Sequence, residues 1–139
     1  MRHKSSLHIR WADLDAFGHI NNTVYLVYVQ EARADFTWYA RKARGEQPIL
    51  ADMVVARAEI DFIEPIYEGG INVDVEIYVT RIGSASFDLA YEISHDGVIK
   101  SKAMTVQVAV SMETKKSRPL NEMEREFLSQ YLDPLSEAK

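Results

Sequence analysis

A long segment that is apolar on nearly every side is the strongest constraint on how this 139-residue chain folds. From Tyr25 to about Arg44, apolar residues recur at the i, i+3, i+4, i+7 spacing of a helix. Val24, Leu26 and Val27 make its first two turns apolar on the remaining sides as well. A helix on one face of a sheet needs only an apolar stripe, so we expect this helix to be surrounded by other structure.

Four segments after the helix alternate between apolar and polar residues, as half-buried strands do. They cover residues 53–62, 71–80, 84–94 and 98–112. In the last segment, the apolar residues on one face are Met104, Val106, Val108 and Val110. The turn before it, His95-Asp96-Gly97, is typical of a hairpin. Short turns join antiparallel strands, so the pattern predicts a fold of the α+β class.

Two weaker patterns complete the expected fold. Leu7, Ile9 and Trp11 alternate with polar residues and predict a short strand before the helix. Residues 121–132 predict a short amphipathic helix that begins with a capping box. We therefore expect a single domain over residues 1–139, with an antiparallel sheet wrapped around a long central helix. Few residues remain to cover the outer side of the sheet, so we expect a partner subunit there.

Composition excludes several classes of protein. Apolar residues at 47% and charged residues at 27% are typical of a globular domain. The formal net charge of -5 disfavours a protein that coats nucleic acid or is held to anionic membranes. The absence of cysteine excludes disulfides and a cysteine nucleophile. No apolar run approaches the roughly 20 residues that span a bilayer, and the N-terminus lacks the apolar stretch of a signal peptide. We expect a cytoplasmic protein without a nucleic-acid or membrane partner.

The polar loop before the helix carries the residues best suited to chemistry. Asp13, Asp15 and His19 lie in it, and it ends at Asn22, where the helix begins. Unpaired backbone N–H groups and the positive end of the dipole at a helix N-terminus favour an anion or a polarised carbonyl oxygen. A carboxylate beside such donors suits acyl transfer, because it can attack or activate water while the donors hold the oxyanion.

The loop and the start of the helix resemble the signature of the 4-hydroxybenzoyl-CoA thioesterase family of hotdog-fold proteins. The matching residues are Asp13-x-Asp15-x-x-Gly18-His19-x-Asn21-Asn22-x-x-Tyr25-Leu26 and then Glu31-Ala32-Arg33. Later matches, which extend the resemblance over nearly the whole chain, are Glu64-Pro65, Gly69-Gly70 and Gly83-x-Ala85-Ser86. The resemblance implies a homodimer or homotetramer that hydrolyses an acyl-CoA to free acid and coenzyme A. It implies no metal and no cofactor, because coenzyme A is part of the substrate.

The resemblance also assigns roles to residues of the loop. It makes Asp15 the catalytic carboxylate, either as nucleophile or as general base for water. Asn22 falls at the position whose backbone N–H polarises the thioester carbonyl. Gly18 would allow the tight turn that aims the loop, because glycine tolerates a positive φ. We expect Asp13 to be structural, since aspartate is common in turns and caps.

Other residues are candidates for substrate binding. His19 either contacts substrate or holds the loop by hydrogen bonds, and Tyr25 belongs either to the core or to the floor of an acyl pocket. Glu31 and Arg33 are expected to form an ion pair or an interface. Candidates for the pantetheine channel are Arg81, Ser84 and Ser86. A basic turn, either simply solvated or bound to the phosphates of coenzyme A, contains Lys115, Lys116 and Arg118.

Several alternatives remain open at this point. The chain could be a thioesterase acting on acyl carrier protein, or a module that binds acyl-CoA without catalysis. Asp13, Asp15 and His19 are all metal-ligand types, although no further well-spaced histidine accompanies them. The Asp-x-Asp pair also occurs in phosphotransferases that form an aspartyl phosphate, but the segment before it does not read as a buried apolar strand.

Overall fold

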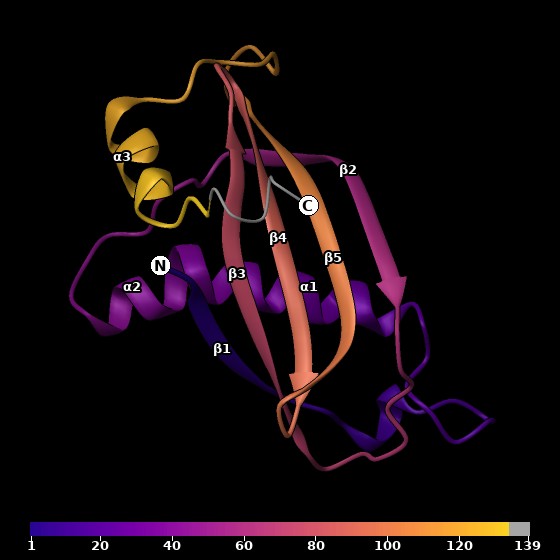
Figure 1. The fold of residues 1–139 in the computed structure, drawn as a ribbon. Coiled ribbons are helices and arrows are strands. Elements are labelled where there is room, and N and C mark those ends of the chain that lie inside the picture. The colour runs from indigo at the N-terminus through magenta and orange to yellow at the C-terminus, as the bar shows by residue number, and fades with distance from the viewer. Residues whose placement is uncertain (134–139) are drawn as a thin grey trace.

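Five antiparallel strands form one sheet in the order β1-β3-β4-β5-β2 (Figure 1). The computed structural model describes residues 1–133. Its strands are β1 (His3–His8), β2 (Met53–Phe62), β3 (Asn72–Ile82), β4 (Ser86–His95) and β5 (Val98–Ala109). The sheet therefore has β1 at one edge and β2 at the other. The last residues of the predicted domain, 134–139, lie outside the described part of the chain.

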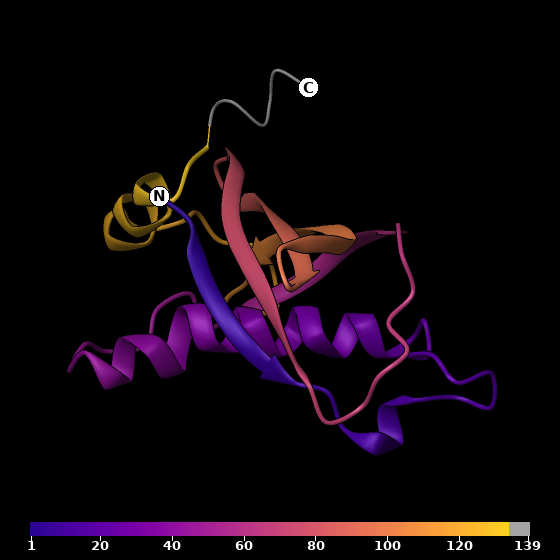
Figure 2. The same cartoon turned by 60° about the horizontal axis from the view of Figure 1, so that its bottom comes forward.

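One long helix of 20 residues runs across a single face of the sheet (Figures 1 and 2). It consists of α1 (Val24–Ala34), a π-helical turn (Asp35–Tyr39) and α2 (Ala40–Ala43). The sheet residues that face it with no exposed surface include Val73, Val75, Ile77, Leu89 and Ile93. Burial of these side chains against α1 forms the core, which confirms the predicted sheet around a central helix.

Local sequence signals agree with most of the observed elements. The predicted strand 53–62 has the bounds of β2, and β3, β4 and β5 differ from prediction by a few residues at their ends. Asp96 and Gly97 both have a positive φ, as a two-residue hairpin of type I′ requires. Asn121 and Glu124 form the predicted capping box of α3 (Glu122–Gln130). This last helix packs beside β3, where the Phe127 ring lies 4.9 Å from the ring of Phe36.

The first strand differs from its prediction. It lies at His3–His8 instead of Leu7 to Trp11, and Trp11 begins a short 3-10 turn with 83% of its surface exposed. The chain leaves the sheet because the Asp13 carboxylate accepts the backbone N–H of Arg10 and closes a turn. Apolar alternation does not reveal this strand, because it contains polar residues such as Ser5, which is buried.

The surroundings of the first helical turns and the orientation of β5 also differ from expectation. Leu26 and Val27 are 46% and 45% exposed, so residues 1–133 do not surround the first turns of the helix. In β5 the residues that face the helix are Ser101, Ala103, Thr105, Gln107 and Ala109, whereas the apolar set beginning at Met104 faces outward. Small and polar side chains face inward on β5 because they pack beside bulky ones on β4, such as Tyr91 opposite Ala103.

In the part of the chain described, no helix is long and apolar enough to cross a membrane.

Candidate active site

Asp13 anchors the loop that connects β1 to the central helix. Its carboxylate accepts hydrogen bonds from the Arg10 guanidinium at 2.8 Å and from the Tyr28 hydroxyl, also at 2.8 Å. Only 1% of Asp13 is exposed. Burial alone would raise the pKa of Asp13, but the hydrogen bonds from Arg10 and Tyr28 outweigh it and lower this pKa. Asp13 is thus a charged structural anchor, with both oxygens occupied.

Asp15 lies two residues further on, in a tight turn. Its backbone carbonyl accepts the N–H of Gly18 at 3.1 Å, and its carboxylate oxygen Oδ1 accepts the N–H of Phe17 at 2.9 Å. Gly18 has a φ of 80°, the left-handed conformation expected of it. The other oxygen, Oδ2, lies 3.6 Å from Nδ1 of His19, and the Asp15 side chain keeps 22% of its surface exposed. The turn leaves this carboxylate partly open to solvent.

The entry to α1 leaves one backbone donor without a partner. Asn21 accepts the backbone N–H of Thr23 on its side-chain oxygen and so closes the turn just before α1. The N–H groups of Asn21 and Val24 donate to the carbonyl oxygens of Asp13 and Asn21. Among residues 1–133 the N–H of Asn22 donates to no group. This free donor at a helix N-terminus can bind an oxygen that gains negative charge.

A cavity of about 180 Å³ opens beside this donor. Its lining residues are His19, Ile20, Asn22, Tyr25, Phe62, Glu64 and Pro65. Three predicted site residues, His19, Asn22 and Tyr25, therefore surround one space, and Asp15 adjoins it through its contact with His19. Tyr25 is buried, its ring lies 5.2 Å from that of Phe62, and burial raises the pKa of its hydroxyl. It is both a core residue and the floor of the cavity.

The far wall of this cavity comes from a segment that is distant from the loop in the sequence. Phe62 and Glu64 come from the end of β2 and the segment after it, some 40 residues from Asn22 in the chain. The Tyr67 ring lies 6.3 Å from that of His19, and Tyr67 is 64% exposed. The sequence marks Glu64-Pro65 only as part of a turn, because no local pattern shows that this turn meets the loop.

The predicted contacts for coenzyme A lie at the other end of the sheet in the same chain (Figure 1). Arg81 donates to Ser86 at 2.8 Å and to Asp88 at 2.9 Å, beside the β3–β4 turn that contains Ser84. Arg118 binds both carboxylate oxygens of Glu124, at 2.9 and 3.0 Å. Its bidentate fork, predicted for a phosphate, is therefore engaged within the chain.

Lys115 and Lys116 lie in the same region, in the turn after β5, and both are exposed. Lys115 has a φ of 61°. Within residues 1–133 neither amine forms an ion pair, so both remain available to an anion.

Arg33 donates to the Tyr91 hydroxyl at 3.3 Å, and within the described chain it forms no ion pair with Glu31.

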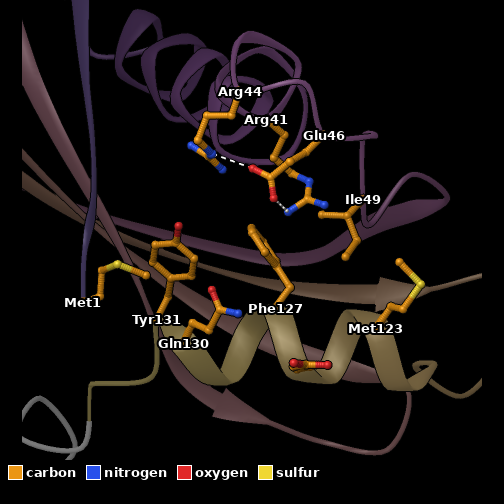
Figure 3. A pocket seen from close by; sticks show the side chains of 10 residues that line it. Met1, Arg41, Arg44, Glu46, Ile49, Met123, Phe127, Gln130 and Tyr131 are labelled. Carbon is orange, nitrogen blue, oxygen red and sulfur yellow. Dashed lines mark hydrogen bonds and ion pairs between the residues drawn. The ribbon is translucent and has the colours of Figure 1, made fainter.

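A larger cavity, about 490 Å³, is separate from the loop (Figure 3). It lies between α2 and α3, and Arg41, Arg44 and Glu46 approach it from one side (Figure 3). Glu46 pairs with both arginines, so their charges are largely satisfied by the chain itself.

In the described chain, no group of three or more histidine, aspartate or glutamate side chains is placed to hold a metal ion.

Comparison with known proteins gives the family. The sequence profile of the thioesterase-like superfamily matches residues 9–130. The 1,4-dihydroxy-2-naphthoyl-CoA hydrolase of Synechococcus elongatus is 28% identical over 74 residues, which are 53% of this chain and 54% of that protein. The chain thus matches about half the length of this curated relative.

Solved structures agree over almost the whole chain. A predicted thioesterase from Bacillus stearothermophilus is 25% identical, with a TM-score of 0.81 over 96% of this chain and 98% of that one. A thioesterase from Thermus thermophilus, complexed with coenzyme A and Zn, is 27% identical, with a TM-score of 0.75 over 92% of each chain. These matches confirm the predicted hotdog fold, while the narrower resemblance to 4-hydroxybenzoyl-CoA thioesterases stays a prediction. The chain belongs to the thioesterase-like superfamily.

Proposed function

We propose that this protein hydrolyses an acyl-CoA thioester to the free acid and coenzyme A. The observation that carries the proposal is the free N–H of Asn22 beside a cavity whose rim adjoins the Asp15 carboxylate. Thioester hydrolysis needs a group that attacks or activates water and a donor for the oxyanion, and these two residues supply them. The superfamily, and a similar thioesterase that was crystallised with coenzyme A, support this substrate class.

The proposed reaction has two routes that use the same residues. As a general base, Asp15 takes a proton from water, whose oxygen then attacks the thioester carbon. As a nucleophile, its carboxylate attacks that carbon directly, releases the thiolate and forms an anhydride that water cleaves. In both routes the Asn22 N–H and the dipole of α1 stabilise the negative charge on the carbonyl oxygen, and the thiolate leaves as coenzyme A. Neither route requires a metal ion or another cofactor.

We further propose that the working unit is a dimer built through β2. This strand is a ten-residue edge with no neighbour on one side in the described chain. Val55 and Phe62 on it are 46% and 47% exposed, and Leu26 on the adjacent helix is 46% exposed. A long edge strand with exposed apolar residues and no covering element is unusual in a monomer, and a second copy of the same strand would cover it antiparallel by a twofold axis.

The dimer would bring together groups that are far apart in one chain. Antiparallel pairing over the whole of β2 reverses one sheet relative to the other, so the loop end of one subunit adjoins the opposite end of the other. Lys115 and Lys116 of the partner subunit would then lie on the side where the substrate leaves the cavity. Their amines suit the phosphates of coenzyme A.

The deciding experiment measures thiol release from acetyl-, hexanoyl-, palmitoyl- and phenylacetyl-CoA by wild type, Asp15→Asn and Asp13→Asn proteins. Asp15→Asn should lower kcat by about 100-fold or more, the scale of a lost catalytic carboxylate, with an unchanged circular dichroism spectrum. Turnover in Asp15→Asn like that of wild type would remove Asp15 from the mechanism. Binding of the esters without any thiol release would instead identify a non-catalytic binding module, and release from acyl carrier protein alone would identify a different substrate.

A further inference from the structure

Aromatic rings gather at the cavity beside the start of α1 in greater number than the proposed reaction requires. Tyr25, Phe62 and His19 line this cavity. Two further rings contact His19: that of Phe17 lies 6.2 Å away and nearly parallel, and that of Tyr67 lies 6.3 Å away. Phe17 and Tyr67 are 84% and 64% exposed. Large apolar side chains that are exposed together mark sites of interaction, so these rings call for a ligand.

The charge around the same cavity is negative. Glu64 lines it with a side chain that is 54% exposed, and the Asp15 carboxylate adjoins it through His19. Among residues 1–133 no lysine or arginine lines the cavity. Lys100 lies outside it, with its Nζ 3.7 Å from Oε2 of Glu64, too far for a hydrogen bond. An acyl group in the cavity therefore meets negative charge and no cation on the wall.

Aromatic rings beside a carboxylate suit a quaternary ammonium group. The face of an aromatic ring attracts a cation within about 6 Å, and a carboxylate adds a full opposite charge. A quaternary ammonium carries methyl groups in place of N–H donors, so it packs against rings as an apolar group does. A primary ammonium would have N–H donors left to satisfy, and a carboxylate would be repelled by Glu64 and Asp15.

The size of the cavity limits the acyl group that fits. Its volume of about 180 Å³ equals that of about six molecules of liquid water. A trimethylammonium group joined to the carbonyl by one methylene has slightly fewer heavy atoms than this beyond the carbonyl carbon. The cation of such a group would lie close to the carbonyl carbon, and so within the part of the site that the rings and Glu64 surround.

We infer that the cavity selects a short acyl group that ends in a quaternary ammonium. The inference rests on the proposed thioesterase activity and names the substrate class of the same site. The carbonyl oxygen accepts the N–H of Asn22, and the cationic end lies against the three rings with Glu64 as its counter-charge. Asp15 then attacks, or activates water, next to a cation that is already paired.

The first test compares esters of one shape. N,N,N-trimethylglycyl-CoA and 3,3-dimethylbutanoyl-CoA differ only in a quaternary nitrogen in place of a quaternary carbon. The cation also makes its ester more reactive, so the ratio of the two kcat/KM values is divided by the ratio of the uncatalysed hydrolysis rates. In wild type this corrected ratio should favour the cationic ester by about 10- to 30-fold, the scale of a desolvated cation–π contact. Malonyl-CoA, which carries a carboxylate at the same place, should be the poorest substrate of the three.

Variants assign the preference to residues, because the intrinsic reactivity of the esters cancels between proteins. Glu64→Gln removes the charge at nearly constant shape and should lower the ratio by about 3- to 5-fold, the scale of a partly exposed charge pair. Phe62→Leu removes a ring and should lower it by a similar factor. Glu68→Gln changes an exposed acid of the same segment that does not line the cavity, so it is the matched control and should keep the wild-type ratio. Added sodium chloride should reduce the ratio more in wild type than in Glu64→Gln, because salt screens the charge of Glu64.

The outcomes separate the inference from the proposed function. A corrected ratio near one in wild type, or faster hydrolysis of malonyl-CoA than of the cationic ester, would overturn the inference and leave the thioesterase proposal standing. A ratio that both Glu64→Gln and Phe62→Leu leave unchanged would do the same. Hydrolysis of no ester would overturn the thioesterase proposal, and calorimetry on wild type would then test the cavity by binding alone. Tighter binding of the cationic ester than of its neutral isostere would support the inference, and equal Kd values would overturn it.

Discussion

Asp13 and Asp15 show how two residues of one type acquire different roles. Asp13 is buried and accepts hydrogen bonds from Arg10 and Tyr28, while Asp15 sits in a turn that leaves one of its oxygens near His19 and solvent. The difference arises because residue 13 faces α1 at the start of the loop, whereas Gly18 turns the chain outward after residue 15. Substitution of Asp13 should therefore affect stability, and substitution of Asp15 should affect thiol release.

Asp13 should make stability depend on pH. Its pKa is lower in the folded protein than its ordinary value of 3.8, because hydrogen bonds from Arg10 and Tyr28 outweigh the effect of burial. The folded state thus holds the proton more weakly than the unfolded state, so this stabilisation is complete above about pH 4 and is lost as pH falls through the lowered pKa. Urea unfolding of wild type between pH 2 and 7 should show the loss, and Asp13→Asn should be less stable at pH 7 by about 2 kcal/mol and less sensitive to acid. An acid profile in the variant that matches wild type would contradict the assignment.

The sequence predicted the polar residues of the loop better than the residues that line the nearby cavity. Gly18 and Asp13 act through neighbours a few residues away, so their preference for turns was visible in the sequence. Glu64 and Phe62 reach the cavity through strand pairing, over separations that no local pattern reports. For Phe62, its position depends on the register of β2 against β5.

At the scale of elements, α3 depends on one ion pair. Glu124 is 4% exposed and completes the capping box of the helix, while Arg118 binds both of its carboxylate oxygens. Burial alone would raise the pKa of Glu124, but the hydrogen bonds from Arg118 and the Asn121 backbone lower it. Arg118 therefore connects the end of β5 to α3, a structural use of a residue that was predicted to bind phosphate.

Substitutions in the turn after β5 should separate stability from binding. Arg118→Ala leaves Glu124 without its partner and should destabilise the fold by about 2 kcal/mol, which lowers Tm by several degrees. Lys115→Ala and Lys116→Ala should leave Tm unchanged and raise KM for coenzyme A esters. Calorimetry and steady-state kinetics on the three variants would check this. An unchanged Tm in Arg118→Ala would contradict its structural role, and an unchanged KM in both Lys115→Ala and Lys116→Ala would contradict their role in binding.

The sequence predicted strands less well where the buried side chains are polar or small, as in β1 and β5. The sequence indicated β2 and the hairpin correctly, because alternation and an Asp-Gly turn are local signals. β1 begins with polar residues that are held by side-chain bonds, such as Ser5 and His3 to Asp35, and so lacked the apolar signal. In β5 the apolar face points outward, which a single strand cannot reveal without its neighbours.

At the scale of the molecule, the proposed dimer makes a mass prediction. Light scattering should give twice the 15.9 kDa mass of one chain, or four times if dimers associate through the outer face of the sheet. Leu26→Lys introduces a charge on the exposed helix surface next to β2 and should shift the mass toward one chain and reduce thiol release. Val98→Lys, at a position that is also 46% exposed but lies at the β4–β5 hairpin, is the control and should remain wild type in mass. A monomeric wild-type protein with full activity would contradict a site shared between subunits.

The π-helical turn in the middle of the long helix holds one residue more than an α-helical turn. An α-helix rotates by about 100° per residue, so an extra residue within regular α-helix would rotate everything after it. Deleting one residue from Asp35–Tyr39 would instead convert the wide turn into an α-helical turn and leave α2 in nearly the same rotation relative to α1. Arg41 would keep its place over the Phe127 ring, and the N-terminal half, with Asn22 and Tyr25, would keep its orientation. The wide turn therefore marks a place where the chain can lose one residue without rotating the helix that borders the cavity at α3.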